Sequence, residues 1–377
     1  MRLSCLQENL RRGLDIVGRA VATRTTLPIT QSVLLVAEES RLKLSATNLE
    51  IAITCWVGAK VEEEGSLAVP ARLLSEFVSS LPNDRVDMNV EAQGRQLHLK
   101  CARLEAHISG QDPDDFPPIP AIAEGTAVQA DAELLRKAIS RVAFAAATDE
   151  SRPVLTGVSA EFEDDQITLA AADGFRLAVH KLPLVAPVSE KTSVIVPARA
   201  LNELNRLLGD QTEPVEVTLS PNGTQLLFHL QSADMVSQTI QGTFPNYKQL
   251  IPKSYVTRCL VDVGEFLRAT RIAALFARDS SGIVRLQIGG DEEAAAGKVV
   301  VSARAEEVGD NVGEVDASIE GTPGKIAFNA RYLTDVLAEL GSGQVALETT
   351  SPSSPGLLRP VGSEDYIHVV MPMFVQW

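Results

Sequence analysis

The sequence is poor in the features that mark secreted, membrane-bound and redox proteins. Its four cysteines, Cys5, Cys55, Cys101 and Cys259, are far apart and form no C-x-x-C pair, which predicts free thiols in a reducing compartment. No apolar run approaches the roughly 18 residues that a membrane helix needs. The N-terminal stretch MRLSCLQENLRRG lacks the apolar core of a secretory signal. We therefore expect a cytoplasmic protein with no membrane partner.

Recognisable catalytic motifs are missing as well. The patterns G-x-x-x-x-G-K-[ST], G-x-G-x-x-G, G-x-S-x-G and H-E-x-x-H do not occur. The five histidines, at 98, 107, 180, 229 and 368, do not pair at ligand spacing, and the first four sit in strand-like runs where packing or solvation is expected. The carboxylate cluster of Asp112, Asp114 and Asp115 could hold a metal, but its Pro-rich surroundings favour a surface turn. The sequence therefore predicts no catalytic site, no metal and no cofactor.

What the chain does contain is a long internal repeat. VPARLL begins at Val69, VPARAL at Val196, and a looser copy, FNARYL, at Phe328. Each copy follows an amphipathic helical segment with a Leu-Arg pair and a stretch of strand-like alternation, and each is followed by further strands. Because helix, hairpin, helix and strands recur in one order, three similar domains of about 125 residues are favoured over three unrelated α+β domains.

The repeat gives explicit expectations for the fold. The predicted helices span 2–24, 70–81, 131–147, 197–208, 262–278 and 329–340, with proline in the first turn of the VPAR helices. Each domain would be of the α+β class, with two helices packed on roughly six to eight antiparallel strands. Pro-rich stretches near Ile122 and Lys253 place the domains at 1–122, 123–253 and 254–377.

Charge is distributed unevenly along the chain. The net charge is −15, which alone argues against nucleic acid as a partner. The six predicted helices, however, hold 15 Lys and Arg against 10 Asp and Glu, whereas the rest of the chain holds 19 against 39. If the helices of three similar domains line one face, that face could hold the phosphates of a duplex without reading its bases. The same count also fits arginine that simply favours solvated helix faces.

Several stretches resemble one family throughout. They are TTLPITQSVLLVAEESRLKLSATNLEIAI (25–53), SRPVLTG (151–157), AADGFRLAV (171–179), SVIVPAR (193–199), FPNYKQLIP (244–252) and YIHVVMPM (366–373). In this order and spacing they resemble the bacterial DNA polymerase III beta subunit, the sliding clamp and processivity factor. The resemblance implies a head-to-tail homodimeric ring of six domains whose helices surround double-stranded DNA. It also implies that the DNA polymerase III alpha subunit, other polymerases and repair proteins bind through a short clamp-binding motif, and that a separate ATP-driven clamp loader opens the ring.

The resemblance also assigns site residues. DNA contacts would come from Arg24, Arg72, Arg136, Arg141, Arg152 and Arg199. The partner-peptide pocket would comprise Leu155, Ala172, Asp173, Gly174, Phe175, Arg176, Leu177, Pro245, Gln249, Leu250, Asn329, Tyr332, Val369, Val370, Met371, Pro372 and Met373. The dimer interface would join Ala106 and Ile108 to Leu275 and Phe276, which are expected to follow the opening helix of the third repeat.

The chain departs from the family pattern at three places that bear on peptide preference. Ala172 and Phe175 stand where the family often has Thr and His, FVQW follows Met373 where the family tail commonly ends sooner, and GGDEEAAAG (289–297) lengthens a hairpin. YIHVV predicts a closing strand, and Pro372 should then release the tail from the sheet, so that Trp377 could cover or extend the pocket. Two other interpretations remain: a β-rich peptide-binding scaffold that never encircles DNA, and an enzyme with an unrecognised site in its acidic loops.

Overall fold

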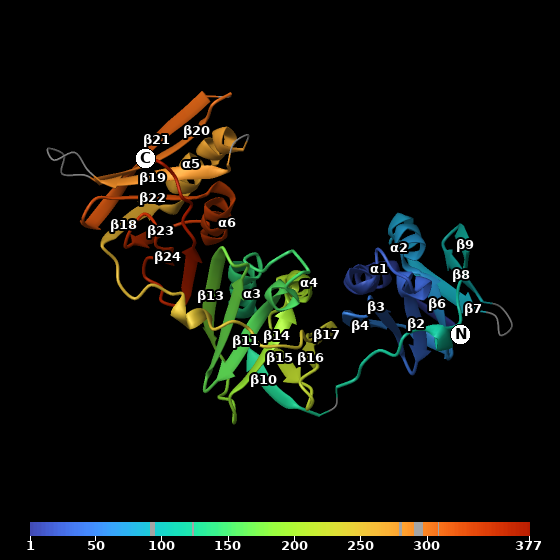
Figure 1. Ribbon diagram of the computed structural model, residues 1–377. Coiled ribbons are helices and arrows are strands. Elements are labelled where there is room, and N and C mark those ends of the chain that lie inside the picture. Colours follow the sequence, from blue (N-terminus) through green and yellow to red (C-terminus); the bar gives the residue numbers. More distant parts are fainter. Residues whose placement is uncertain (91–94, 123, 279–280, 290–296, 308) are drawn as a thin grey trace. The chain divides into compact units, whose positions relative to one another are not determined.

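The computed structural model describes residues 1–377 apart from 91–94, 123, 279–280, 290–296 and 308 (Figure 1). Most of the GGDEEAAAG insertion therefore lies outside the described residues. The chain divides into two compact units, Met1–Glu133 with Arg199–Thr239, and Leu134–Ala198 with Ile240–Trp377. Within the described parts, no helix has the length and apolar character needed to cross a bilayer.

The first unit contains two antiparallel sheets. The smaller has the order β5-β1-β7-β8-β9, with strands Lys60–Glu63, Arg2–Leu6, Arg85–Val90, Gln96–Cys101 and Leu104–Ser109. The larger has the order β10-β15-β16-β17-β4-β3-β2-β6, with strands Thr126–Ala130, Val215–Leu219, Gln225–His229, Ala233–Gln238, Ile51–Gly58, Arg41–Thr47, Ser32–Glu38 and Gly65–Pro70. Pairing of β17 with β4 brings segments about 180 residues apart in sequence into one sheet.

The second unit is built on a single twelve-stranded sheet. Its order is β14-β11-β12-β13-β25-β24-β23-β18-β21-β20-β19-β22. The strands are Thr192–Pro197, Gly157–Glu163, Gln166–Ala172, Arg176–Pro183, Tyr366–Val370, Gly356–Pro360, Gln344–Thr349, Thr257–Asp262, Gly309–Gly321, Gly297–Ala305, Ile283–Gly289 and Gly324–Asn329, in that order. Antiparallel pairing of β13 with β25 joins the middle of the chain to its C-terminal strand.

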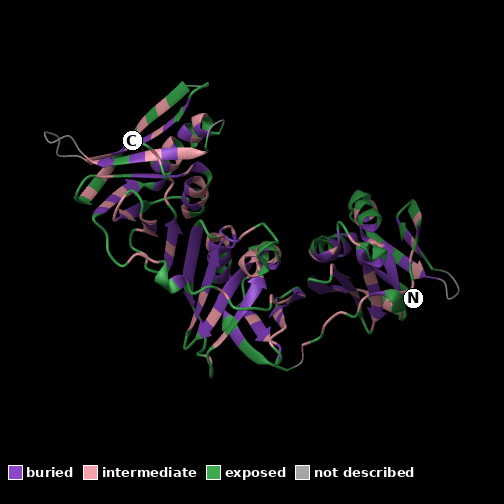
Figure 2. Cartoon of the chain, viewed as in Figure 1, coloured by how far each residue is buried: buried purple, intermediate pink, exposed green. Residues whose placement is uncertain are grey.

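Six α-helices lie among the described residues, and they test the helix predictions. They are α1 (Gln7–Val17), α2 (Ala71–Ser80), α3 (Ala132–Ala143), α4 (Ala198–Leu207), α5 (Val263–Ala277) and α6 (Ala330–Leu340). Each lies within a predicted range. With these bounds the helices hold 11 Lys and Arg against 8 Asp and Glu, so their excess of positive charge is smaller than predicted but keeps its sign. Figure 2 shows the buried residues concentrated along the strands.

The prediction for the first helix, 2–24, was wrong at both ends. Arg2–Leu6 is strand β1, which pairs with β5 on one side and β7 on the other, so inter-strand hydrogen bonds override the helical spacing of the leucines. Gly18–Ala20 is a short 3-10 turn. The proline prediction was off by one position, because Pro70 ends strand β6 and caps α2 rather than entering its first turn.

The burial pattern of β25 separates the two faces of the large sheet. Tyr366, His368 and Val370 are buried on one face, whereas Ile367 and Val369 lie on the other, as the period of two in a strand requires. The predicted closing strand is therefore confirmed, and so is the placement of the other four histidines in strands. All four cysteines are free and buried, and burial raises the pKa of the Cys55 thiol to about 12.

Close approach of α1 to the sheet gives a prediction about Gly13. A Cβ at Gly13 would lie 2.7 Å from a methyl group of Val57 and 2.8 Å from one of Leu44. Gly13→Ala should therefore lower the free energy of unfolding by about 1–3 kcal/mol through overpacking. Gly18→Ala is the control, because a Cβ there meets nothing within 4 Å. Thermal unfolding of both variants should show a lower midpoint for Gly13→Ala alone, and equal midpoints would contradict the packing argument.

Candidate functional site

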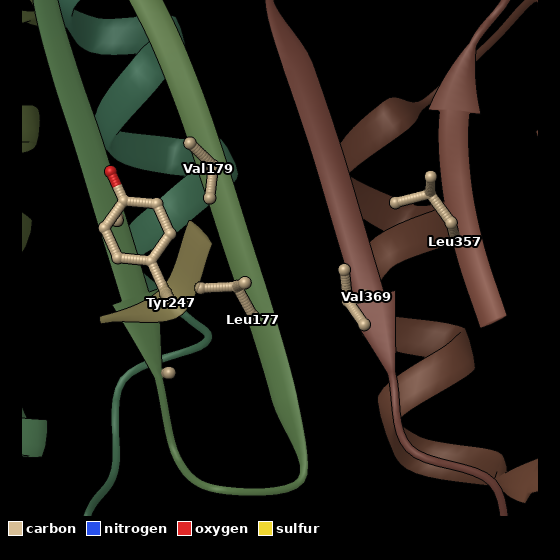
Figure 3. Packing of buried hydrophobic residues seen from close by; sticks show 7 residues of the cluster. Leu177, Val179, Tyr247, Leu357 and Val369 are labelled. Carbon is tan, nitrogen blue, oxygen red and sulfur yellow. The ribbon is translucent and has the colours of Figure 1, made fainter. Parts of the chain in front are cut away.

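The face of the sheet that carries Leu177 and Val369 holds an apolar cluster. Its buried members come from β12, β13, β24, β25 and the segment before β18, and they are Ala170, Ala172, Leu177, Val179, Tyr247, Leu357 and Val369. In Figure 3, Leu177 and Val179 project from β13 toward Tyr247, and Val369 and Leu357 come from the adjoining strands. The register of β13 and β25 places Leu177 opposite Val369. The structure thus brings together three of the predicted pocket residues, Ala172, Leu177 and Val369.

Large apolar side chains close in sequence to members of this cluster remain exposed. Phe175 is 56 % exposed, Leu250 is 55 % exposed and Met371 is 42 % exposed. The Phe175 ring stacks on Tyr332 with centroids 6.3 Å apart, and the N–H of Met371 donates to the carbonyl of Phe175 at 2.8 Å. Exposed apolar groups gathered beside a buried apolar floor are typical of a binding surface.

The other predicted pocket residues occupy varied positions. Pro245 and Gln249 are exposed, and Leu155, Pro372 and Met373 are half-buried. Asn329 caps α6, because its Oδ1 accepts from the N–H groups of Arg331 and Tyr332.

Tyr247 is a functional candidate that the sequence analysis missed. It lies between two predicted pocket residues, is buried in the apolar cluster, and its hydroxyl approaches Glu161 at 3.5 Å. Burial, with the charge of Glu161, raises the pKa of this phenol. The single aromatic residue within PNYKQLIP was the available signal, since a tyrosine flanked by polar residues often anchors a loop to a core.

Arg176 and Val370 were predicted in the pocket, but they lie on the opposite face of the sheet, where they are buried. The Arg176 guanidinium donates from Nε to Asp173 at 3.0 Å, from Nη1 to Asp335 at 2.6 Å, and from Nη2 to the carbonyl of Phe144 at 2.8 Å. It also stacks over the ring of Tyr332 at 4.6 Å. Arg176 therefore fixes the turn that carries Phe175 against α6 and the end of α3.

That turn depends on glycine and aspartate. Asp173 Oδ1 accepts from the N–H groups of Phe175 and Arg176, which closes the turn. Gly174 has φ of +93°, and a Cβ there would lie 3.1 Å from Arg152 Nη1. Arg152 in turn donates to the carbonyl of Asp173. The exposed position of Phe175 is thus set by the backbone around it.

A buried aromatic group lies behind Arg176. The hydroxyl of Tyr366 and Nδ1 of His368 are 3.2 Å apart, and the His368 ring stacks on Phe144. His180 Nδ1 lies 2.9 Å from the carbonyl of Asp365. Burial, aided by the charge of Arg176, lowers the pKa of His368 to about 3, and burial lowers the pKa of His180 to about 4. Both imidazoles are therefore neutral at physiological pH.

Arg141 does not match the expectation of an exposed helix arginine. It is half-buried, and its guanidinium lies 5.3 Å from the centroid of the Tyr366 ring. The other predicted DNA contacts are exposed. Arg72 lies on α2 with an ion pair to Glu76, and the remaining four are Arg24 after the first 3-10 turn, Arg136 on α3, Arg152 before a 3-10 turn, and Arg199 on α4.

The predicted interface residues lie at a sheet edge and a helix end. Ala106 and Ile108 are on β9, the last strand of its sheet. Because the Ile108 side chain is buried, a partner strand at this edge would bind the main-chain N–H and C=O groups. Leu275 and Phe276 lie in the last turn of α5, inside the predicted helix 262–278 and not after it. Leu275 is 57 % exposed, and α5 packs on β21, where Val312 is 62 % exposed.

Val312 and Ile272 are further candidates that the sequence analysis missed. Both are exposed apolar residues, Ile272 on α5 and Val312 on β21. Among the described residues, β21 pairs with β20 from Gly309 to Ala317 but with β18 only from Ala317 onward. Its first half therefore has one open edge. The alternation in DNVGEVDASIE was the available signal for such a strand.

The C-terminal tail lies elsewhere than predicted. The strand ends at Val370 as expected, but the N–H of Met373 donates to the carbonyl of Ala327 on β22 at 2.8 Å. The Trp377 ring lies 5.8 Å from Lys325 Nζ. Trp377 is therefore held against β22 and does not cover Leu177 and its neighbours.

The DPDD cluster forms a capped turn. Asp112 Oδ1 accepts from the N–H of Asp114, and its Oδ2 pairs with Arg95 at 2.7 Å. Where the chain is described, no group of three or more His, Cys, Asp or Glu side chains is arranged to hold a metal.

The contacts of Arg176 predict a large effect of its removal. Arg176→Ala would leave Asp173 and Asp335 without their buried cation, so the free energy of unfolding should fall by about 3 kcal/mol. Arg331→Ala is the matched control, because Arg331 is exposed and lies 4.0 Å from the same Asp335 carboxylate. Urea denaturation of both variants measures the difference, and similar losses would refute the role given to Arg176.

The two buried histidines predict a loss of stability in mild acid. Because their folded pKa values lie below the usual 6.5, the unfolded chain binds more protons below that pH. The contribution of these two histidines to the free energy of unfolding is therefore fully present above pH 7. Between pH 7 and pH 5 the free energy of unfolding should fall by at most about 2 kcal/mol for each histidine. Denaturation curves at several pH values should show this slope, and His180→Gln should make it shallower. A flat profile over that range would contradict it.

Comparison with known proteins identifies the family. Three consecutive family profiles match: the DNA polymerase III beta subunit N-terminal domain at 1–120, its central domain at 129–246 and its C-terminal domain at 248–374. The beta sliding clamp of Staphylococcus aureus is 32 % identical over 94 % of each chain, and that of Synechococcus elongatus is 33 % identical over 99 % of each.

Solved structures agree. The DNA polymerase sliding clamp from Bacillus subtilis matches with a TM-score of 0.93 at 29 % identity, and the DNA polymerase III subunit beta from Pseudomonas aeruginosa with 0.91 at 29 %. Each match covers all of both chains. The three tandem domains of helices and antiparallel sheets are therefore clamp domains, and the chain belongs to the bacterial DNA polymerase III beta subunit family, the beta sliding clamps.

Proposed function

We propose that two copies of this DNA sliding clamp close head to tail into a ring around double-stranded DNA. The ring would hold DNA topologically, without reading its sequence and without a catalytic step of its own. The exposed apolar surface around Phe175 and Leu177 would tether the DNA polymerase III alpha subunit, other polymerases and repair proteins. A clamp loader would open the ring, and the work would take place in the cytoplasm. Boundaries near 122 and 253 remain our proposal for the three domains.

A rule of strand pairing is the observation that carries ring closure. Each domain consists of two halves, and each half is a strand, a helix and three strands, with β5 as an extra strand. The last strand of the second half of domain two, β17, pairs with the last strand of the first half of domain one, β4. The last strand of the second half of domain three, β25, pairs likewise with β13 of domain two.

Within one chain, two strands lack the partner that this rule assigns to them. The rule would pair β9, the last strand of domain one, with β21, the last strand in the first half of domain three. β9 ends its sheet, and β21 has one open edge along Gly309–Asp316 where the chain is described. A second copy can supply each missing partner, which closes a ring with two identical joints.

Exposed side chains beside β21 support this joint and provide its test. Leu275 and Val312 expose apolar surface that pairing with a second copy would bury. Leu275→Asp combined with Val312→Asp should give folded monomers at concentrations where the unchanged chain is a dimer. Val185→Asp, at an equally exposed valine between β13 and β14, is the control and should remain dimeric. Light scattering gives the mass of the assembly. A double variant that remains dimeric would contradict the proposed joint.

The exposed arginines Arg24 and Arg136 predict how DNA is held. Arg24→Glu with Arg136→Glu should shorten retention on nicked circular DNA several-fold, because a phosphate contact is lost and a repulsion added at each site. Lys60→Glu on strand β5 combined with Lys181→Glu on strand β13 is the control, because it makes the same change of charge at two exposed strand positions. Loader-assisted retention on circular and linear duplexes is the measurement. Equal retention on both forms would instead favour a scaffold that does not encircle DNA.

A further inference from the structure

The edge of strand β22 is covered by the chain's own C-terminus. β22 ends the order of the large sheet and pairs with β19 on its other side. Met373 bonds to Ala327, and Trp377 lies beside Lys325, so the tail runs antiparallel to β22. An extended segment laid on a free sheet edge is the geometry of strand addition in peptide recognition.

The tail ends at a hollow that it does not fill. A hollow of about 510 Å³ is lined by Trp377 together with Val256, Ile288, Pro323, Lys325 and Thr349. Trp377 remains 46 % exposed at its margin. There is room in it for an aromatic side chain, and the ammonium of Lys325 favours an aromatic ring or a carboxylate. We call the Lys325–Ala327 edge and this hollow the tail groove.

The interactions that hold the tail on β22 are weak. Met373 contributes a main-chain hydrogen bond and Trp377 a cation–π contact, whereas Phe374 is 85 % exposed. The same segment begins beside the apolar surface described above, since Met371 bonds to Phe175. A peptide seated on that surface can therefore continue into the tail groove once the tail leaves it.

We propose that the tail groove is a second peptide subsite, that Met373–Trp377 is its occupant in cis, and that an extended partner segment carrying an aromatic residue displaces the tail. This inference rests on the proposed peptide-binding function. The partner would combine a clamp-binding motif with a strand-forming extension that ends in an aromatic and an acidic residue. Its backbone would replace Met373 on Ala327, and its aromatic side chain would take the place of Trp377.

The test uses four peptides and three forms of the chain. The peptides are an apolar clamp-binding pentapeptide, the same peptide extended at either end by a Val-Gln-Trp-Asp segment, and the free tail peptide MFVQW. The chains are the intact protein, a form that ends at Pro372, and Lys325→Ala in the truncated form. Of the two extended peptides, we consider the one that binds more tightly. The truncated form should bind it at least fivefold more tightly than the intact chain does, and Lys325→Ala should reverse most of this gain.

The pentapeptide separates the two proposals. It should bind the intact and truncated chains within about twofold of each other, and its failure to bind either would count against the proposed function alone. MFVQW should then still bind the truncated form and not the intact one. If the extended peptide and MFVQW bind the intact and truncated chains equally, the tail groove is not a peptide subsite.

A spectroscopic readout follows displacement directly. The chain has two tryptophans, so Trp56→Phe leaves Trp377 as the sole indole reporter when the peptides carry phenylalanine in its place. Trp377 emission should shift to longer wavelength on adding the extended peptide and stay constant with the pentapeptide. Tight binding of the extended peptide with unchanged emission would show that it bypasses the tail, which would overturn the proposed exchange.

Discussion

The hydrogen bonds of the buried Arg176 guanidinium hold together the part of the second unit where its two domains meet. A buried cation is stable only when its hydrogen bonds are satisfied, and here two carboxylates, a carbonyl and two aromatic faces surround it. These partners come from the Asp173 turn, the end of α3 and helix α6. One side chain therefore couples the joint between two domains to the shape of the apolar surface on the other face of the sheet.

Several features follow from this coupling. The Asp173 turn exposes Phe175, and Phe175 rests on Tyr332, which itself lies over Arg176. Pairing of β13 with β25 places Leu177 and Val369 together on the outer face. The surface proposed to bind partners is thus assembled from two domains, and its preorganisation comes from buried groups that a partner would not touch.

The repeated pattern was enough to predict the three-domain α+β fold and the six helices, because helical spacing and the VPAR signal are local. The strand at Arg2–Leu6 could not be predicted, since its pairing partners lie about 60 and 85 residues away. Position on a helix did not reveal that Arg141 is stacked over Tyr366, because that contact comes from a strand at the other end of the chain. The resemblance located Ala172, Leu177 and Val369 together, but it could not show that Arg176 and Val370 face the opposite way.

The strand-pairing rule has a consequence for assembly as a whole. β9 and β21 are different strands, so the joint that they would form is heterologous, and such a joint either closes on itself or adds copies without limit. The number of subunits in a closed assembly is then fixed by the curvature accumulated along one chain, and not by the strength of the joint. A change that altered the bend at β17–β4 or β13–β25 by a few degrees would leave each joint intact and yet convert rings into larger rings or helical fibres.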